Sequence, residues 1–202
     1  MTIKLTKNEL RTQQTRFNQF QRYLPTLQLK KAMLQFEVSI ATAEIQKLVN
    51  DHDAIWARVV DFSPLLVEKV TVNIVEYADI LHVKKHYENI AGVEIPIFKS
   101  VVFKEPEYFL FDTPVWTERA TEILRELVIA REKIKIAEEK KHALEKELRD
   151  VSIRVNLFEK VLIPRSQENI KKIRIFLGDQ QLSAVAQAKV AKRKILLRKA
   201  EL

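Results

Sequence analysis

Apolar side chains recur at two positions of every heptad from about Thr6 to Val60. Eleven of the fourteen positions defined by this repeat carry an apolar residue. Such a period, kept over seven heptads, is typical of a helix that packs along one seam in a coiled coil. The positions are Leu10, Gln13, Phe17, Phe20, Leu24, Leu27, Lys31, Leu34, Val38, Ala41, Ile45, Leu48, His52 and Ile55.

The opening helix has a start signal and one interruption. Thr6 can cap its first turn, and Glu9 three residues later completes a capping box. Pro25 lacks a backbone donor, so we expect a kink near Tyr23–Leu24. Because the heptad register continues across Pro25, the sequence predicts one kinked helix rather than two separate helices.

A second heptad pattern follows Asp112-Thr113-Pro114, where a capping residue followed by proline predicts a helix start. Thirteen of its fourteen seam positions are apolar. Pro164 then interrupts the pattern, and the stripe resumes in a shifted register, as at a stutter. The seam positions are Trp116, Ala120, Ile123, Leu127, Ala130, Ile134, Ala137, Lys141, Leu144, Leu148, Val151, Val155, Phe158 and Leu162; the shifted positions are Ile170, Ile173, Leu177, Ala184, Ala188, Ala191 and Ile195.

The residues between the two helical segments alternate apolar and polar side chains in short runs. We expect a β-hairpin of about Leu81–Ile90 and Val93–Phe103 that turns near Ala91-Gly92. Gly92 and Pro96 are its candidate turn residues. Residues 61–79 fit a helix or a strand.

These patterns define three expected regions: an N-terminal coiled-coil helix (1–60), a central region with the β-hairpin (61–113) and a long C-terminal coiled-coil helix (114–202). Two helices with one narrow seam each pack most simply on each other, and the chain reversal makes the pair antiparallel. The expected fold class is mostly α, a long antiparallel two-helix coiled coil with a small central β-hairpin region. Both termini would then lie at one end of the coil.

Composition excludes several other classes. The chain has 202 residues, 47% of them apolar, which is enough to bury a core. Only two glycines are present, so folds built on many tight turns fit poorly, and the absence of cysteine excludes disulfides and thiol nucleophiles. The N-terminus lacks the apolar stretch of a signal peptide, and the longest uncharged run, nine residues, is too short to cross a membrane.

No motif for catalysis or phosphate binding is present in the sequence. Gly92 and Gly178 stand in neither GxxxxGK nor GxGxxG. His82 and His86 have a spacing that suits a metal on a helix, but the surrounding pattern is that of a strand. We therefore expect no catalytic residue, no cofactor and no metal site.

The polar residues in the two seams include Lys31, His52 and Lys141. We interpret them as register-fixing positions whose stems pack while the charge reaches water. The alternative is that each marks a place where a partner protein supplies an acid.

The net charge of +8 is concentrated at the chain ends. Residues 1–35 carry seven Lys and Arg against one acid, and residues 166–202 carry nine against three, so each end contributes +6. In an antiparallel pair these ends would meet in one basic tip that attracts an acidic partner. Its candidate partner-binding residues are Arg11, Arg16, Lys189, Lys192, Arg193, Lys194, Arg198 and Lys199.

The partner of such a tip could be a nucleic acid or an acidic protein socket. No aromatic residue that could stack on a base follows Phe176, which disfavours nucleic acid. Charge combined with the apolar ridge of Ile195, Leu196 and Leu197 favours a protein socket.

One run of residues within the second helix consists of Arg154, Val155, Asn156, Glu159, Ile163 and Pro164, followed by Ile170, Ile173 and Leu177. This run resembles a signature of the D subunits of V-type and A-type ATPases. The opening helix at Thr6–Leu10 and Leu27–Leu34, and the segment Asn89–Pro96, are similar to further parts of that family in the same order. Together the three segments span nearly the whole chain.

The resemblance implies a central-stalk rotor component that couples ATP hydrolysis or synthesis to ion translocation by rotation. Such a component has no catalytic residue or cofactor and is cytoplasmic, peripheral to the membrane. The implied partners are the catalytic and regulatory ring subunits (the A and B subunits), the small F subunit of the stalk and a funnel-shaped protein that joins the stalk to the membrane ring, with no nucleic acid and no direct membrane insertion. The alternative is a stand-alone coiled-coil scaffold or nucleic-acid-binding helical protein.

Overall fold

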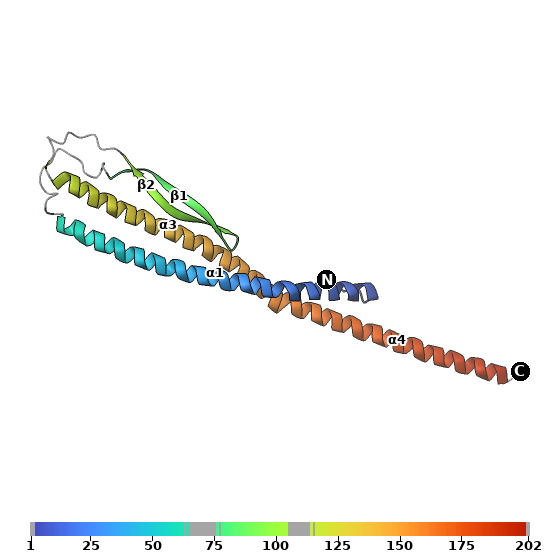
Figure 1. The fold of residues 1–202 in the computed structure, drawn as a ribbon. Coiled ribbons are helices and arrows are strands. Elements are labelled where there is room, and N and C mark those ends of the chain that lie inside the picture. The colour runs from blue at the N-terminus through green and yellow to red at the C-terminus, as the bar shows by residue number, and fades with distance from the viewer. Residues whose placement is uncertain are drawn as a thin grey trace. The chain divides into compact units, whose positions relative to one another are not determined.

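The fold is that of a computed structural model, which describes residues 3–62, 64, 76, 78–104, 114 and 116–200, without the side chains of Phe62, Leu197, Lys199 and Ala200. Its elements are α1 (Lys7–Phe62), β1 (Ile80–Ile90), β2 (Val93–Phe103), α3 (Trp116–Leu157), the π-helical turn η3 (Phe158–Leu162) and α4 (Ile163–Ala200), as labelled in Figure 1. The chain forms two compact units, residues 30–150 and residues 1–29 with 151–202. The predicted start at Asp112-Thr113 and most of segment 61–79 lie outside the described residues.

Both predicted seams are confirmed by burial. Every one of the twenty-eight seam positions predicted up to Leu162 is buried or half-buried. Leu34, Ala41 and Leu144 are among those that are fully buried, as expected for side chains that lie between two helices. The fold is mostly helical with one small hairpin, as the sequence predicts.

The start of α1 matches its predicted cap in part. The Glu9 amide donates to Thr6 Oγ1 over 3.3 Å, so Thr6 caps the helix. The Glu9 carboxylate accepts a hydrogen bond from Gln13 Nε2 at 2.8 Å, one turn further along the helix. Pro25 lies inside one continuous α1, as predicted, while the kink near Tyr23–Leu24 stays a prediction.

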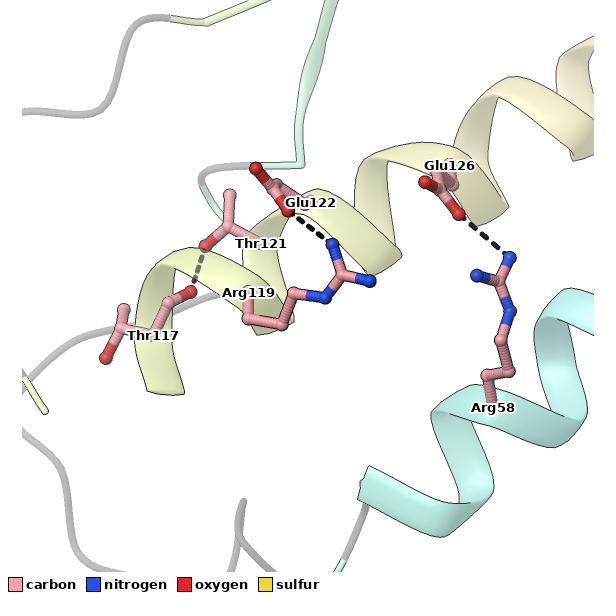
Figure 2. A network of polar contacts seen from close by, with 6 residues as sticks. All are labelled: Arg58, Thr117, Arg119, Thr121, Glu122 and Glu126. Carbon is pink, nitrogen blue, oxygen red and sulfur yellow. Dashed lines mark hydrogen bonds and ion pairs between the residues drawn. The ribbon is translucent and has the colours of Figure 1, made fainter. Parts of the chain in front are cut away.

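In the unit of residues 30–150, α1 and α3 run antiparallel. Three ion pairs link them: Lys30 with Glu147 (2.6 Å), Glu44 with Lys140 (2.8 Å) and Arg58 with Glu126 (2.9 Å). From one ion pair to the next, the residue number on α1 rises while the residue number of its partner on α3 falls. This order is found only when two helices are antiparallel. Figure 2 shows Arg58 of α1 reaching across to Glu126 of α3.

The hairpin forms almost where the sequence places it. Antiparallel β1 and β2 pair from Ile80 with Phe103 to Ile90 with Val93, with irregularities near Leu81 and after Lys84. The intervening Ala91 and Gly92 both have positive φ, 53° and 83°, the geometry of a tight primed turn. The register therefore follows from this two-residue turn.

Pro96 is not a turn residue, contrary to the prediction. It lies within β2, paired with Tyr87 of β1, and its side chain is buried. A proline is tolerated in a two-stranded sheet because each strand has one edge that bonds to no neighbour.

In the unit of residues 1–29 and 151–202, a π-helical turn joins α3 to α4. The Ile163 amide donates to the Phe158 carbonyl, five residues back, just before Pro164. A π-turn holds one residue more than an α-turn and therefore shifts everything that follows by one position.

Extending the heptad from Leu162 gives positions 165, 169, 172 and 176, of which only Asn169 is buried. The positions one residue later, Ser166, Ile170, Ile173 and Leu177, are all buried or half-buried. The predicted register shift thus has a defined structural cause. The shifted stripe ends at Leu177, however: the predicted positions Ala184, Ala188, Ala191 and Ile195 are exposed, because α4 has no neighbouring helix there among the described residues.

Candidate partner-binding surfaces

The last part of α4 is a helix without neighbours among the described residues. Every side chain from Asp179 to Leu196 is exposed, and so is that of Arg198. By contrast, Ile170 and Ile173, about two turns before Asp179, are buried. Figure 1 shows α4 continuing past the beginning of α1. We call residues 179–200 the free end of α4.

The free end carries most of the predicted tip residues. Lys189, Lys192, Arg193 and Lys194 are exposed, as is Arg198, while the side chain of Lys199 lies outside the described part. Successive helical residues are 100° apart, so these cations point in several directions around the axis. Exposed apolar side chains are interspersed among them: Leu182, Val185, Val190, Ile195 and Leu196.

Arg11 and Arg16 do not join this cluster, so the prediction of one combined basic tip is wrong. Both are exposed on α1 and line a shallow depression with Asn8, Thr12 and Thr15. Phe17 of α1 borders Ile170 of α4, and burial along α4 ends at about Leu177. Lys189 lies twelve residues further, roughly 18 Å along the helix axis.

The N-terminal and C-terminal cations are apart because the two helices extend to different lengths beyond the contact of Phe20 with Phe158. The rings of Phe20 and Phe158 pack against each other. Before Phe20, α1 offers only residues 7–19, whereas after Phe158 the helix continues to residue 200. The additional helical length is in α4, so the C-terminal cations lie beyond the N-terminal ones.

The run Arg154–Pro164 that resembles a family signature surrounds the π-turn. Val155 is buried and Ile163 half-buried, whereas Arg154, Asn156, Glu159 and Pro164 are exposed. Val155 therefore packs in the seam, and Pro164 explains the π-turn, since proline has no amide for the Lys160 carbonyl. The exposed polar members remain available to other molecules.

The hairpin contacts α3 through cationic side chains as well as through apolar packing. Ile95 is completely buried, and Lys85 of β1 pairs with Glu139 of α3. Lys133 Nζ lies 5.6 Å from the centre of the Phe98 ring, and the Arg125 guanidinium lies 5.1 Å from that of Phe103. Figure 1 shows both strands alongside α3.

The turn of the hairpin reaches α1. A Cβ placed on Gly92 would lie 3.7 Å from Lys30 Nζ, and that ammonium also pairs with Glu147 of α3. The Gly92 amide donates to Asn89 Oδ1 at 2.9 Å, which holds the turn in shape. The outer strand β1 keeps most of its side chains exposed, among them Leu81 and Tyr87.

His82 and His86 lie on β1, in accord with a strand rather than a helix. Among the described residues, no group of three or more His, Cys, Asp or Glu is placed to hold a metal ion. No helix in the described part of the chain is long and apolar enough to span a membrane.

Comparison with known proteins identifies the family. The family model for the ATP synthase D subunit matches residues 9–193. A V-type ATP synthase D subunit of Chlamydia abortus is 43% identical over 200 residues, which cover 98% of this chain and 96% of that protein. Those of Chlamydia felis and Chlamydia trachomatis serovar L2 are 45% and 44% identical, with 98% and 96% of this chain and 96% of each relative covered. A full-length match at this identity, on a chain with these seams and this hairpin, means that the protein belongs to the family of ATP synthase D subunits.

Proposed function

We propose that this chain is the central-stalk shaft of a V/A-type ATPase. It couples ATP hydrolysis or synthesis in the catalytic ring to ion translocation by rotating, and it has no catalytic residue of its own. The observation that carries the proposal is the free end of α4, a basic helix on which every described side chain is exposed.

A solitary helix of this length is only marginally stable in water, because most helical stability in proteins comes from packing. The free end therefore needs a partner that surrounds it. Cations and apolar residues on all its sides suit a ring of proteins better than a flat surface. An exposed ion pair of Lys or Arg with an acid contributes only about 0–1 kcal/mol of binding free energy. Such contacts can therefore break and re-form as the shaft turns.

The coil supplies the other requirement of a shaft. Two helices that share a seam resist twisting better than one helix, and every predicted seam position from Leu10 to Ile55 on α1 is buried or half-buried. The asymmetry of the shaft then decides which ring site is open, which is a coupling free energy between sites.

The proposed partners follow from this role. The free end of α4 lies within the ring of A and B subunits, and the rest of the coil binds the small F subunit of the stalk and the funnel-shaped protein that joins the membrane ring. The protein is then cytoplasmic and peripheral to the membrane. We expect deletion of the hairpin, residues 80–103, to leave the helices folded but to impair coupling or stalk assembly.

Neutralising the free end tests the proposal. The variant changes Lys189, Lys192, Arg193 and Lys194 to Gln, and its control changes Lys47, Arg131, Lys146 and Arg149, which are exposed on α1 and α3, to Gln. Both are assembled with the ring subunits, and ATP turnover and helical content are measured. We expect lower turnover for the first variant only, with unchanged helicity of the isolated chain. Equal turnover for the two variants and the unmodified protein would refute the proposed role of the free end.

A further inference from the structure

Two interruptions of helical hydrogen bonding occur in the unit of residues 1–29 and 151–202. Pro25 has no amide, so the Gln21 carbonyl lacks its α-helical donor. Pro164 likewise leaves the Lys160 carbonyl without one, and the π-turn precedes it. Next to Pro25, Thr26 Oγ1 donates to the Tyr23 carbonyl at 2.8 Å, a bond of the kind that loosens and bends helices.

The two interruptions flank one contact between the helices. The Phe20 and Phe158 rings pack edge to face with centroids 5.4 Å apart. Phe20 precedes Gln21, and Phe158 is the first residue of the π-turn. The weakened turns of the two helices are therefore near neighbours through this ring pair.

Packing is thin in the same place. None of residues 14–29 and none of residues 156–165, all of which the structure describes, is buried. On either side of the second stretch, Val155 and Ser166 are buried, at 3% and 6% exposure.

Residues 42–61 of α1 are not buried either, but the part of α3 that pairs with them contains the buried Ala130, Ile136 and Ala137. In the stretch of residues 14–29 and 156–165 neither helix has a buried residue. Since packing supplies most of the stability of a protein helix, this stretch should open at a lower free energy than the coil around Leu34 and Leu144.

We propose that residues 20–26 of α1 and 158–164 of η3 and α4 form a compliant joint, in which both helices lose and regain their hydrogen bonds before the coil around Leu34 and Leu144 does. Its use as an elastic element of a rotating shaft rests on the proposed function. The local opening itself does not, so it can be tested on the chain alone.

Hydrogen exchange of the full chain, followed by mass spectrometry, tests the joint. We expect amides in residues 20–29 and 158–168 to exchange at least about tenfold faster than those around Leu34 and Leu144. The free end of α4 is left out of the comparison because it has no neighbouring helix among the described residues. Exchange at the same rate in all these stretches would overturn the proposal.

A variant supplies the sharper arm of the experiment. Pro25→Ala restores a donor for the Gln21 carbonyl, and exchange in residues 21–29 should slow by about tenfold. Thr42→Ala is the matched control: it lies on α1, and its hydroxyl donates to the Val38 carbonyl at 2.8 Å, but no proline is nearby. It should leave residues 21–29 unchanged. No slowing in Pro25→Ala, or slowing of the same size around Leu34 and Leu144, would contradict a local joint.

Discussion

The rings of Phe20 and Phe158 meet edge to face, with 5.4 Å between their centroids, and join α1 to the first residue of the π-turn. An edge-to-face pair contributes about 0.5–1.5 kcal/mol beyond its buried area. Both rings are half-buried, and none of residues 14–29 and 156–165 around them is buried. The ring pair is therefore a principal packing contact in this stretch.

Removing either ring should destabilise the coil. We expect Phe20→Ala and Phe158→Ala to lower the free energy of unfolding by about 2 kcal/mol each. Phe36→Ala, on the same helix but with the ring 64% exposed, should change it by less than about 0.5 kcal/mol. A double-mutant cycle, measured by urea unfolding with circular dichroism, should give a coupling of about 1 kcal/mol between the two rings. Strict additivity would show that the rings do not support each other.

The seam can be tested with two leucines of opposite exposure. Leu34 is fully buried between the helices, whereas Leu182 on the free end of α4 is 71% exposed. Leu34→Ala should cost about 2–5 kcal/mol, and Leu182→Ala should stay within about 0.5 kcal/mol of the unmodified chain. Thermal and urea unfolding of the isolated protein give both values. A large loss for Leu182→Ala would mean that the free end packs on something within the same chain.

The hairpin turn allows two substitutions with opposite signs. Ala91 has a φ of 53°, which a side chain disfavours, so Ala91→Gly should stabilise the hairpin by about 1 kcal/mol. Gly92 has a φ of 83°, so Gly92→Ala should destabilise it by about 1–2 kcal/mol. Protection of the β1 and β2 amides from hydrogen exchange measures both effects. Changes of the same sign in the two variants would contradict the primed turn.

The ion pair of Arg58 and Glu126 should contribute to register more than to stability. Its two side chains are about half-exposed, at 50% and 48%, and their atoms are 2.9 Å apart. We expect the coupling in an Arg58→Ala, Glu126→Ala cycle to be below about 1 kcal/mol at low salt. It should become smaller still near 1 M salt, where the Debye length is about 3 Å. A coupling that is large and insensitive to salt would contradict this.

The sequence was sufficient for much of this fold. A seam residue such as Leu34 or Leu144 is buried because heptad spacing places it on one helix face, and Ala91-Gly92 is the turn because the flanking strands need positive φ there. These features depend on local spacing, which the sequence shows directly.

The features that the sequence did not predict correctly depend on which residues of the two helices meet and on the local hydrogen bonding, and no apolar pattern contains this information. The combined basic tip failed because the length of α4 beyond Phe158 exceeds that of α1 before Phe20, and this is known only once the two rings are seen in contact. In the sequence, the π-turn is visible only as the one-residue shift of the apolar stripe after Pro164. That shift alone does not distinguish a π-turn from other stutters. Pro96 was misassigned because proline is common in turns and is also tolerated at strand edges.

The measurement that tests the central claim most directly is rotation of this chain within an assembled complex. The sequence has no cysteine, so Leu81→Cys, at a 64% exposed position on β1, allows a bead to be attached at one site. With the ring subunits fixed to a surface, we predict that addition of ATP turns the bead continuously in one direction. A bead that stays still while the same complex hydrolyses ATP would contradict the shaft.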